Sequence, residues 1–236
     1  MSIDTTVAVT AAEISPDVIS LHPSYRAVLI GVEGISGGPS NTASEALLAR
    51  AERHIAQRLE TQPLEEWTEF AAWRDAFQSF GVKPRVARSS AEALVRRASG
   101  GLPRIDVLTD IYNAISVLHC VPIGGEDLDH YDGPPRLVIA DGSELCDMVE
   151  SGEIVNSSPA AGEIVWRDDR GVTCRRWNWR QGVRTRLNDA TTRILFILDG
   201  IGNDVDARIT AAADDLVAAI TSEWPEAVIT RRVLPD

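Results

Sequence analysis

The segment Arg175–Gln181 combines three arginines, two tryptophans and two amides within seven residues. If this segment is extended, its side chains alternate between two faces. One face then carries guanidinium and amide donors suited to a phosphate or a carboxyl group: Arg176, Asn178 and Arg180. The other face is mainly apolar and packs: Trp177, Trp179 and Gln181. A solvated arginine face over buried tryptophans explains the pattern equally well, so both interpretations stay open.

Two adjacent glycines, Gly124 and Gly125, follow a predicted helix over 106–119. Paired glycines let the backbone approach a ligand closely and present N–H groups to a developing oxyanion. One side of the helix before them carries three polar residues: Asp110, Asn113 and Ser116. Paired glycines mostly form turns, and a polar helix face is usually solvated. Because the two features adjoin in the sequence, they still indicate a candidate site.

Two carboxylates add to these groups, Glu126 directly after the glycines and Glu163 at the start of a predicted strand. Either can bind an α-ammonium group or orient a water molecule, although a charge at a strand end is often only solvated. No Ser or Cys stands at a recognisable catalytic spacing from a His, and no phosphate-binding or dinucleotide-binding fingerprint occurs. His119, Cys120 and Glu126 lack a further ligand that would fix a metal. The sequence therefore predicts neither a metal nor a cofactor.

The net charge is −12, but the basic residues are concentrated in two stretches, 81–104 and 170–187. The first stretch contains Lys83, Arg96 and Arg97, and the second has six arginines and no acid. Local basic patches, not the net charge, decide whether a protein binds phosphates. The pattern indicates a polyanion as partner if the fold brings these residues together, and separate solvated surfaces if it does not.

The remaining sequence must position these groups. Its hydrophobic periodicity predicts helices over 43–60, 64–80, 91–98, 106–119 and 205–224. It predicts strands over 26–33, 136–140, 163–167, 171–181, 193–198 and 227–233, with a hairpin turn at 168–171. The first dozen residues are expected to form a frayed tail. We expect one α+β domain over 1–236, with a central β-sheet or sandwich, flanking helices and a core unit at about 77–198.

No apolar run approaches the length needed to cross a bilayer, and the N-terminus lacks a signal-peptide pattern. Three widely spaced cysteines fit a reducing compartment better than a disulfide framework. The sequence therefore predicts a soluble cytoplasmic protein without a membrane partner.

Seven short motifs occur here in one order: Phe80–Pro84, Ser89–Arg97, Leu102–Ile105, Asp110–Asn113 with Ser116, Pro122–Asp127, Gly162–Glu163 and Trp177–Gln181. This series resembles freestanding relatives of the B3/B4 domain, the editing module of the phenylalanyl-tRNA synthetase β subunit. The resemblance covers about Phe77–Leu198. It implies an α+β editing-domain fold and hydrolysis, in trans, of the ester of a mischarged aminoacyl-tRNA.

The resemblance also implies roles for the candidate residues. It suggests a catalytic set of Asn113, Gly124, Gly125 and Glu163, and a substrate-binding set of Asp110, Ser116, Glu126 and Asn178. It suggests tRNA contacts by Lys83, Arg96, Arg97, Arg176 and Arg180. The expected partner is mischarged tRNA and not DNA. A non-catalytic binder of tRNA 3′ ends or amino acids, and an unrelated small-molecule enzyme, remain alternatives. The edited amino acid and the oligomeric state stay open.

Overall fold

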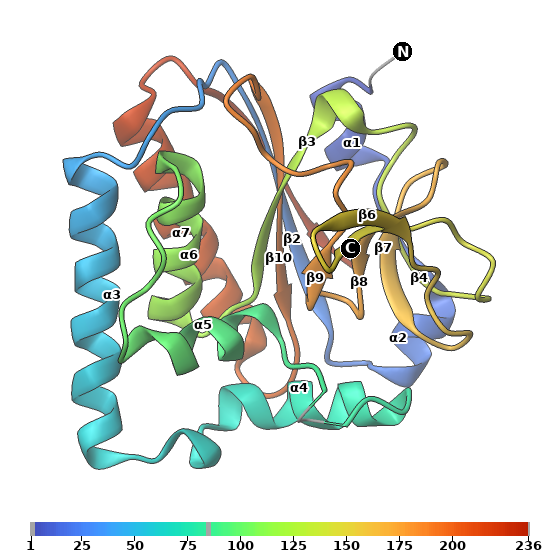
Figure 1. Cartoon of the computed structure of the whole chain (residues 1–236), viewed down its shortest axis with the longest axis horizontal. Helices are drawn as coiled ribbons and strands as arrows, with labels where there is room; N and C mark the ends of the chain where they lie inside the picture. Colours follow the sequence, from blue (N-terminus) through green and yellow to red (C-terminus); the bar gives the residue numbers. More distant parts are fainter. Residues whose placement is uncertain (1–2, 84–85, 236) are drawn as a thin grey trace.

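A four-stranded sheet at the centre of the computed structural model, which describes residues 3–83 and 86–235, organises the other elements (Figure 1). Its strands lie in the order β11-β2-β10-β3, and all neighbours are antiparallel. They are β2 (Arg26–Glu33), β3 (Ile123–Asp127), β10 (Arg193–Gly200) and β11 (Val228–Leu234). Strands β2 and β10 are buried on both faces. Their sequences are therefore almost continuous apolar runs and do not alternate.

Helices cover one face of this sheet in two layers (Figure 1). The inner layer is α6 (Val107–His119) and α7 (Val205–Glu223), which pack on apolar side chains of β2 and β10. The outer layer is α3 (Thr42–Thr61) and α5 (Ser90–Ala98), which pack on the far side of α6. The side chains of Asn41, Ser89 and Asp106 cap α3, α5 and α6, as such residues do at helix starts. The short helix η1 (Leu64–Glu66) and α4 (Thr68–Ser79) connect α3 to α5.

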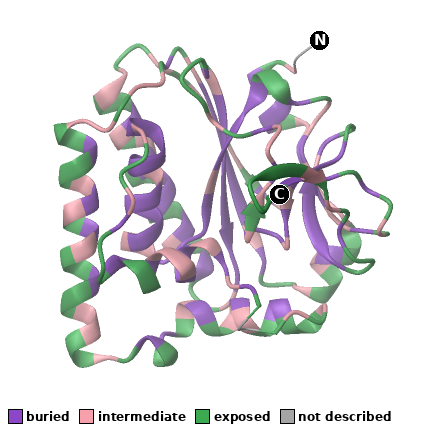
Figure 2. Ribbon diagram, in the orientation of Figure 1, coloured by how far each residue is buried: buried purple, intermediate pink, exposed green. Residues whose placement is uncertain are grey.

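A second, five-stranded sheet packs on the opposite face, with the order β1-β4-β7-β8-β9. Its strands are β1 (Glu13–Ile14), β4 (Arg136–Ile139), β7 (Ile164–Arg167), β8 (Val172–Arg175) and β9 (Arg180–Gln181). The shared core joins Leu195 and Ile197 of β10 to Leu137, Trp166 and Trp177. Four further elements surround this sheet: α1 (Thr5–Thr10), α2 (Pro16–Leu21), η2 (Leu128–His130) and the hairpin of β5 (Asp147–Glu150) and β6 (Glu153–Asn156). Figure 2 shows that burial is concentrated in the central sheet and that the outer face of α3 is exposed.

The predicted α+β architecture is confirmed, and the predicted helices that became α3, α5, α6 and α7 match within one residue at each end. Three local predictions are wrong. Residues 3–12 are not frayed, because Asp4 caps α1 and Val9 is buried; residues 1–2 of the expected tail lie outside the described residues. The stretch 64–80 breaks at Trp67 into η1 and α4. Strands β3, β5 and β6 were not expected. The motif Phe80–Pro84 ends at Pro84, which lies outside the described residues.

Among the helices of the described chain, none combines the length and the apolar character needed to span a membrane.

Candidate functional site

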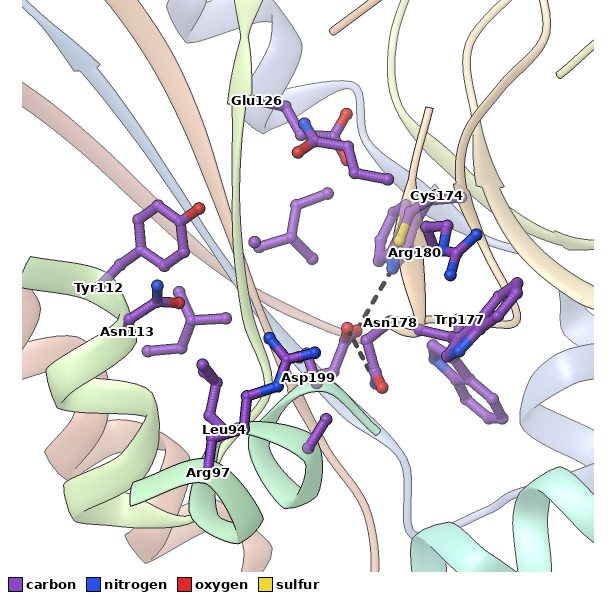
Figure 3. A pocket seen from close by; sticks show the side chains of 18 residues that line it. Leu94, Arg97, Tyr112, Asn113, Glu126, Cys174, Trp177, Asn178, Arg180 and Asp199 are labelled. Carbon is purple, nitrogen blue, oxygen red and sulfur yellow. Dashed lines mark hydrogen bonds between the residues drawn. The ribbon is translucent and has the colours of Figure 1, made fainter. Parts of the chain in front are cut away.

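A pocket of about 270 Å³ opens between the two halves of the fold. Its walls come from α5, α6, β3, β10 and the turn that joins β8 to β9 (Figure 3). Aromatic and aliphatic side chains line it together with acidic, basic and amide groups. A mostly apolar hollow with a few convergent polar groups is the usual form of a small-ligand site.

The period of two along β3 and β10 selects which side chains reach this pocket. Gly124 lies opposite Ile197 in the register, and Glu126 lies opposite Leu195. All four residues therefore lie on the face toward the second sheet. A Cβ atom built on Gly124 meets nothing within 4 Å, so the bare backbone of this glycine is a wall of the pocket.

Gly125 faces the opposite side and does not line the pocket. A Cβ atom there would lie 3.0 Å from Leu187 Cδ1 and 3.1 Å from Phe196 Cε1. Its carbonyl oxygen accepts a hydrogen bond from Gln181 Nε2 at 3.0 Å. The two glycines thus differ: Gly124 opens the pocket, and Gly125 allows tight packing behind it.

The arginine–tryptophan segment is not extended, so the predicted alternation of its side chains is wrong. Arg176 and Trp177 have φ angles of 47° and 66°, in the left-handed region, and the chain reverses between β8 and β9. Trp177 is fully buried, and its ring packs edge-on against Trp73 at a centroid distance of 5.3 Å. Trp179 is half-buried and lies against the guanidinium groups of Arg176 and Arg180, at 4.2 and 4.6 Å from its ring centroid.

This reversal places Asn178 in the pocket wall beside Asp199, a residue that the sequence analysis missed (Figure 3). Asn178 Nδ2 donates to Asp199 Oδ2 at 3.3 Å. The other carboxylate oxygen accepts from Tyr25 Oη at 2.5 Å and from Trp166 Nε1 at 3.3 Å. Burial raises the pKa of Asp199 to about 6. Within the described chain the buried Oδ1 atom of Asn178 has no hydrogen-bond partner, which is uncommon for a buried polar atom.

A second buried carboxyl group, Glu126, lines the same pocket. The hydroxyl of Tyr131 donates a hydrogen bond to it. Burial raises the pKa of Glu126 to about 7. Neither Glu126 nor Asp199 forms an ion pair with any residue in the described part of the chain. In their ionised forms these two carboxylates make the inner end of the pocket negative, so it then attracts positive charge.

The rim has the opposite character. Arg97, in the last turn of α5, and Arg180, at the start of β9, are exposed and line the pocket. Figure 3 shows the guanidinium of Arg97 reaching from α5 toward the cavity, opposite Asn113 on α6. Asn113 is 8% exposed, and within the described residues no hydrogen bond engages its side chain. Four predicted residues from separate parts of the sequence thus line one pocket: Asn113, Asn178, Arg97 and Arg180.

Three other predicted site residues lie elsewhere, although two of them are on the same helix as Asn113. Asp110 is fully buried and accepts from the Ile105 backbone N–H at 2.9 Å, where it fixes the start of α6. Ser116 donates from Oγ to the Val121 carbonyl at 2.7 Å, where it closes the end of α6. Glu163 is buried against Arg175. The expected solvated face of α6 is wrong, since its polar side chains support the backbone.

Three of the residues predicted to contact tRNA phosphates also lie away from the pocket. Arg96 pairs with the buried Glu92 at 3.0 Å and with Glu65 at 3.4 Å. Lys83 is exposed on the loop after α4 and does not line the pocket. Arg176 lies 3.6 Å from Glu163 and covers Trp179. Arg88, Arg96 and Arg104 of the first basic stretch are thus paired with acids, although their side chains stay partly exposed.

Sequence reasoning also missed Tyr112, Trp166 and Cys174 as lining residues, and it named Gln181 only as part of a packing face. Asp199 carried a usable signal, because it is the one acidic residue in the otherwise apolar run of β10 after Arg193. In the described part of the chain, no group of three or more His, Cys, Asp or Glu side chains is arranged to hold a metal ion.

The structure is an α+β domain with a pocket between its helical layers and its second sheet. The B3/4 domain family matches residues 72–214, more than half of the sequence, and the chain belongs to this family. No curated protein matches.

A similar solved structure is the crystal structure of an N-terminal fragment of the phenylalanyl-tRNA synthetase β subunit from Pyrococcus horikoshii. The sequence identity is 11% and the TM-score is 0.46. The alignment covers 95% of this chain and 54% of that fragment, so the chain spans about half the length of the structure it matches.

Proposed function

We propose that this protein is a trans-editing aminoacyl-tRNA deacylase, which hydrolyses the ester of a mischarged tRNA with a positioned water molecule. The observation that carries the proposal is the polarity of the pocket. Buried carboxyl groups and a free amide oxygen lie inside, and exposed arginines lie at the rim. An aminoacyl-tRNA 3′ end has the complementary distribution, with a cationic α-ammonium group on the amino acid and phosphates further along the chain.

The α-ammonium group fits the inner end of the pocket. Asn178 Oδ1 is a buried acceptor without a partner in the described chain, and Asp199 lies directly behind the same amide. An ammonium group donates to such an acceptor, and the nearby carboxylate offsets its positive charge. Glu126 is the second acidic group there, and we assign it to the amino acid as well.

The tRNA end fits the rim. Arg97 and Arg180 supply guanidinium groups for the terminal phosphates. Trp179, held beside Arg180, offers an aromatic surface of the type on which unpaired bases stack. The pocket mouth therefore suits a single-stranded, phosphate-bearing end.

The chemistry needs no nucleophilic side chain, because an aminoacyl ester is already activated. Water attacks the ester carbonyl carbon, a new C–O bond forms, and the bond to the ribose oxygen breaks. The proton lost by water ends on that ribose hydroxyl, so the products are a free amino acid and tRNA. In this proposal Asn113 orients the water, and the bare backbone at Gly124 allows the ester to approach. Asp110, Ser116 and Glu163 have no direct part in it.

Membership of the B3/4 domain family supports a tRNA-related function. The similar solved structure comes from the β subunit of an enzyme that charges tRNA. In this proposal the protein acts in the cytoplasm, after a synthetase has mischarged a tRNA and released it.

The test is hydrolysis of a panel of labelled, mischarged tRNAs by the purified protein, measured against the spontaneous rate. We expect one aminoacyl ester to be lost well above background, which also identifies the edited amino acid. Asn113→Ala and Arg180→Ala should reduce this rate without lowering the melting temperature. A flat panel at protein concentrations that bind tRNA would contradict the enzyme and favour a non-catalytic binder. Binding that hardly depends on salt would instead indicate a small-molecule site.

A further inference from the structure

The turn at Arg176 and Trp177 adopts a backbone conformation that these residues disfavour. Both have positive φ angles, at 47° and 66°. Side chains other than those of Gly, Asn and Asp clash with the backbone in this left-handed region, so it is sparsely populated. Two consecutive bulky residues persist there only when surrounding contacts impose the conformation.

Glu163 supplies several of those contacts. Its Oε1 accepts from the Arg176 backbone N–H at 3.0 Å and from Arg175 Nε at 2.5 Å. Its Oε2 accepts from Arg175 Nη2 at 2.8 Å. The carboxylate is 4% exposed and Arg175 is 7% exposed, so the pair lies inside the protein. One buried side chain therefore fixes both the last residue of β8 and the first residue of the turn.

The left-handed turn also positions Asn178, which lines the pocket. The carbonyl of Asn178 accepts from the Ser90 backbone N–H at 3.2 Å, which connects the turn to the start of α5. Asn178 lines the pocket, its side chain reaches Asp199, and its buried Oδ1 has no hydrogen-bond partner in the described chain. Relaxation of the left-handed turn would move this amide away from the place where a ligand can meet it.

We propose that Glu163 is a positioning residue for the pocket: it holds the left-handed Arg176–Trp177 turn and through it orients Asn178, without touching the substrate. This inference rests on the proposed function for its kinetic consequence. Its structural consequence, the placement of the Asn178 amide, can be measured without any substrate.

The first test is Glu163→Gln, with Glu153→Gln on the exposed strand β6 as matched control. The expected result is a fall in kcat of about 100-fold, the size of effect that a misplacement of about 1 Å produces, with a much smaller change in KM. The control should match the wild type. In the Arg176→Gly background, Glu163→Gln should lower kcat only about tenfold relative to Arg176→Gly alone, instead of about 100-fold. The reason is that glycine adopts positive φ freely and no longer needs Glu163 to hold the turn. No rescue by glycine would overturn the positioning role.

Glu163→Gln leaves Arg175 without its charged partner and can prevent folding. A second pair of variants therefore tests the turn with Glu163 intact: Arg176→Val and Arg176→Gly both lose the guanidinium, but only valine resists positive φ. We expect Arg176→Val to be the less active by about tenfold. Equal activity of the two would refute the inference.

The side-chain amide signals of Asn178, recorded by nuclear magnetic resonance, separate this inference from the proposed function. They should shift in Glu163→Gln and Arg176→Val and return toward the wild-type position when residue 176 is glycine. If the wild type hydrolyses no ester but these shifts occur, the proposed function fails and the positioning role stands. Unchanged signals in both variants would refute the positioning role.

Discussion

The two adjacent glycines of β3 should respond oppositely to substitution, because they face opposite sides of the strand. Gly124 has open space where its side chain would be, and that space is the pocket. Gly124→Val therefore places an isopropyl group into a cavity of about 270 Å³, and its Cβ atom meets no other atom within 4 Å. Valine suits a strand, so the free energy of unfolding should stay within about 0.5 kcal/mol of the wild type.

Gly125→Ala is the internal comparison. Its new methyl group would lie 3.0 Å from Leu187 Cδ1, 3.1 Å from Phe196 Cε1 and 3.2 Å from Tyr112 Cε1. Two of these atoms belong to rings that pack on each other, at a centroid distance of 6.0 Å, so they have little freedom to move. Overpacking of this type costs about 1–3 kcal/mol. We expect Gly125→Ala to lose stability and to keep most of its activity at temperatures where it is folded.

The assay combines ester hydrolysis with urea unfolding monitored by tryptophan fluorescence. Gly124→Val should lower kcat/KM by at least about 100-fold, because the ester can no longer reach its position. Gly38→Val, at a loop glycine that also has open space beside it, controls for a general effect of valine. Full activity of Gly124→Val would refute the placement of the ligand against this backbone. If Gly124→Val lost as much stability as Gly125→Ala, the open space beside Gly124 would be refuted.

Three further predictions concern charge. Burial raises the pKa of Asp199 from its ordinary value to about 6, so the folded state holds this proton more tightly than the unfolded state. Its contribution to the free energy of unfolding should therefore fall by about 2 kcal/mol between pH 4 and pH 7, and Asp199→Asn should flatten that part of a urea-unfolding pH series. A slope unchanged by the substitution would contradict it. Arg97→Ala and Arg180→Ala should each weaken tRNA binding and reduce the slope of log K against log salt by about 0.7, with an unchanged melting temperature. A parallel shift at constant slope would show that neither contacts a phosphate. Glu92→Gln removes the buried carboxylate that pairs with Arg74 and should lower the free energy of unfolding by about 3 kcal/mol in chemical denaturation. A loss under about 1 kcal/mol would contradict a stabilising role of the ion pairs of Glu92.

The sequence predicted the elements of this fold better than the contacts between them. Helix α6 was predictable to one residue, because Asp106 is a helix-capping residue and apolar side chains recur at helical spacing after it. Strand β3 was not, since four of its five residues are glycines or acids, which are depleted in strands, and Ile123 is its one β-branched residue. What makes β3 a strand is its pairing with β10, and that pairing depends on residues about 70 positions later in the chain.

The candidate site shows the same division. Asn113, Gly124, Arg97, Asn178 and Arg180 were named from residue type and do line the pocket. Asp199 was missed because its partners are distant: Tyr25 lies 174 residues before it. The turn at Arg176 was misjudged because no local signal, such as a glycine, marks its left-handed backbone. The burial of Trp177, the contacts of Glu163 and the hydrogen bond from the Trp177 N–H to the Ile164 carbonyl hold it.

The distribution of paired and unpaired arginines explains how an acidic protein can hold a polyanion at one place. In both basic stretches, several arginines are occupied by acids: Arg96 by Glu92, Arg175 by Glu163 and Arg184 by Asp168. Arg97 and Arg180 have no such partner in the described chain and meet at the pocket rim. With a net charge of −12, most of the surface repels nucleic acid, so binding energy is confined to the few contacts beside the pocket. Under the proposed function, tRNA binding should therefore be weak away from the 3′ end and should permit release once the ester has been hydrolysed.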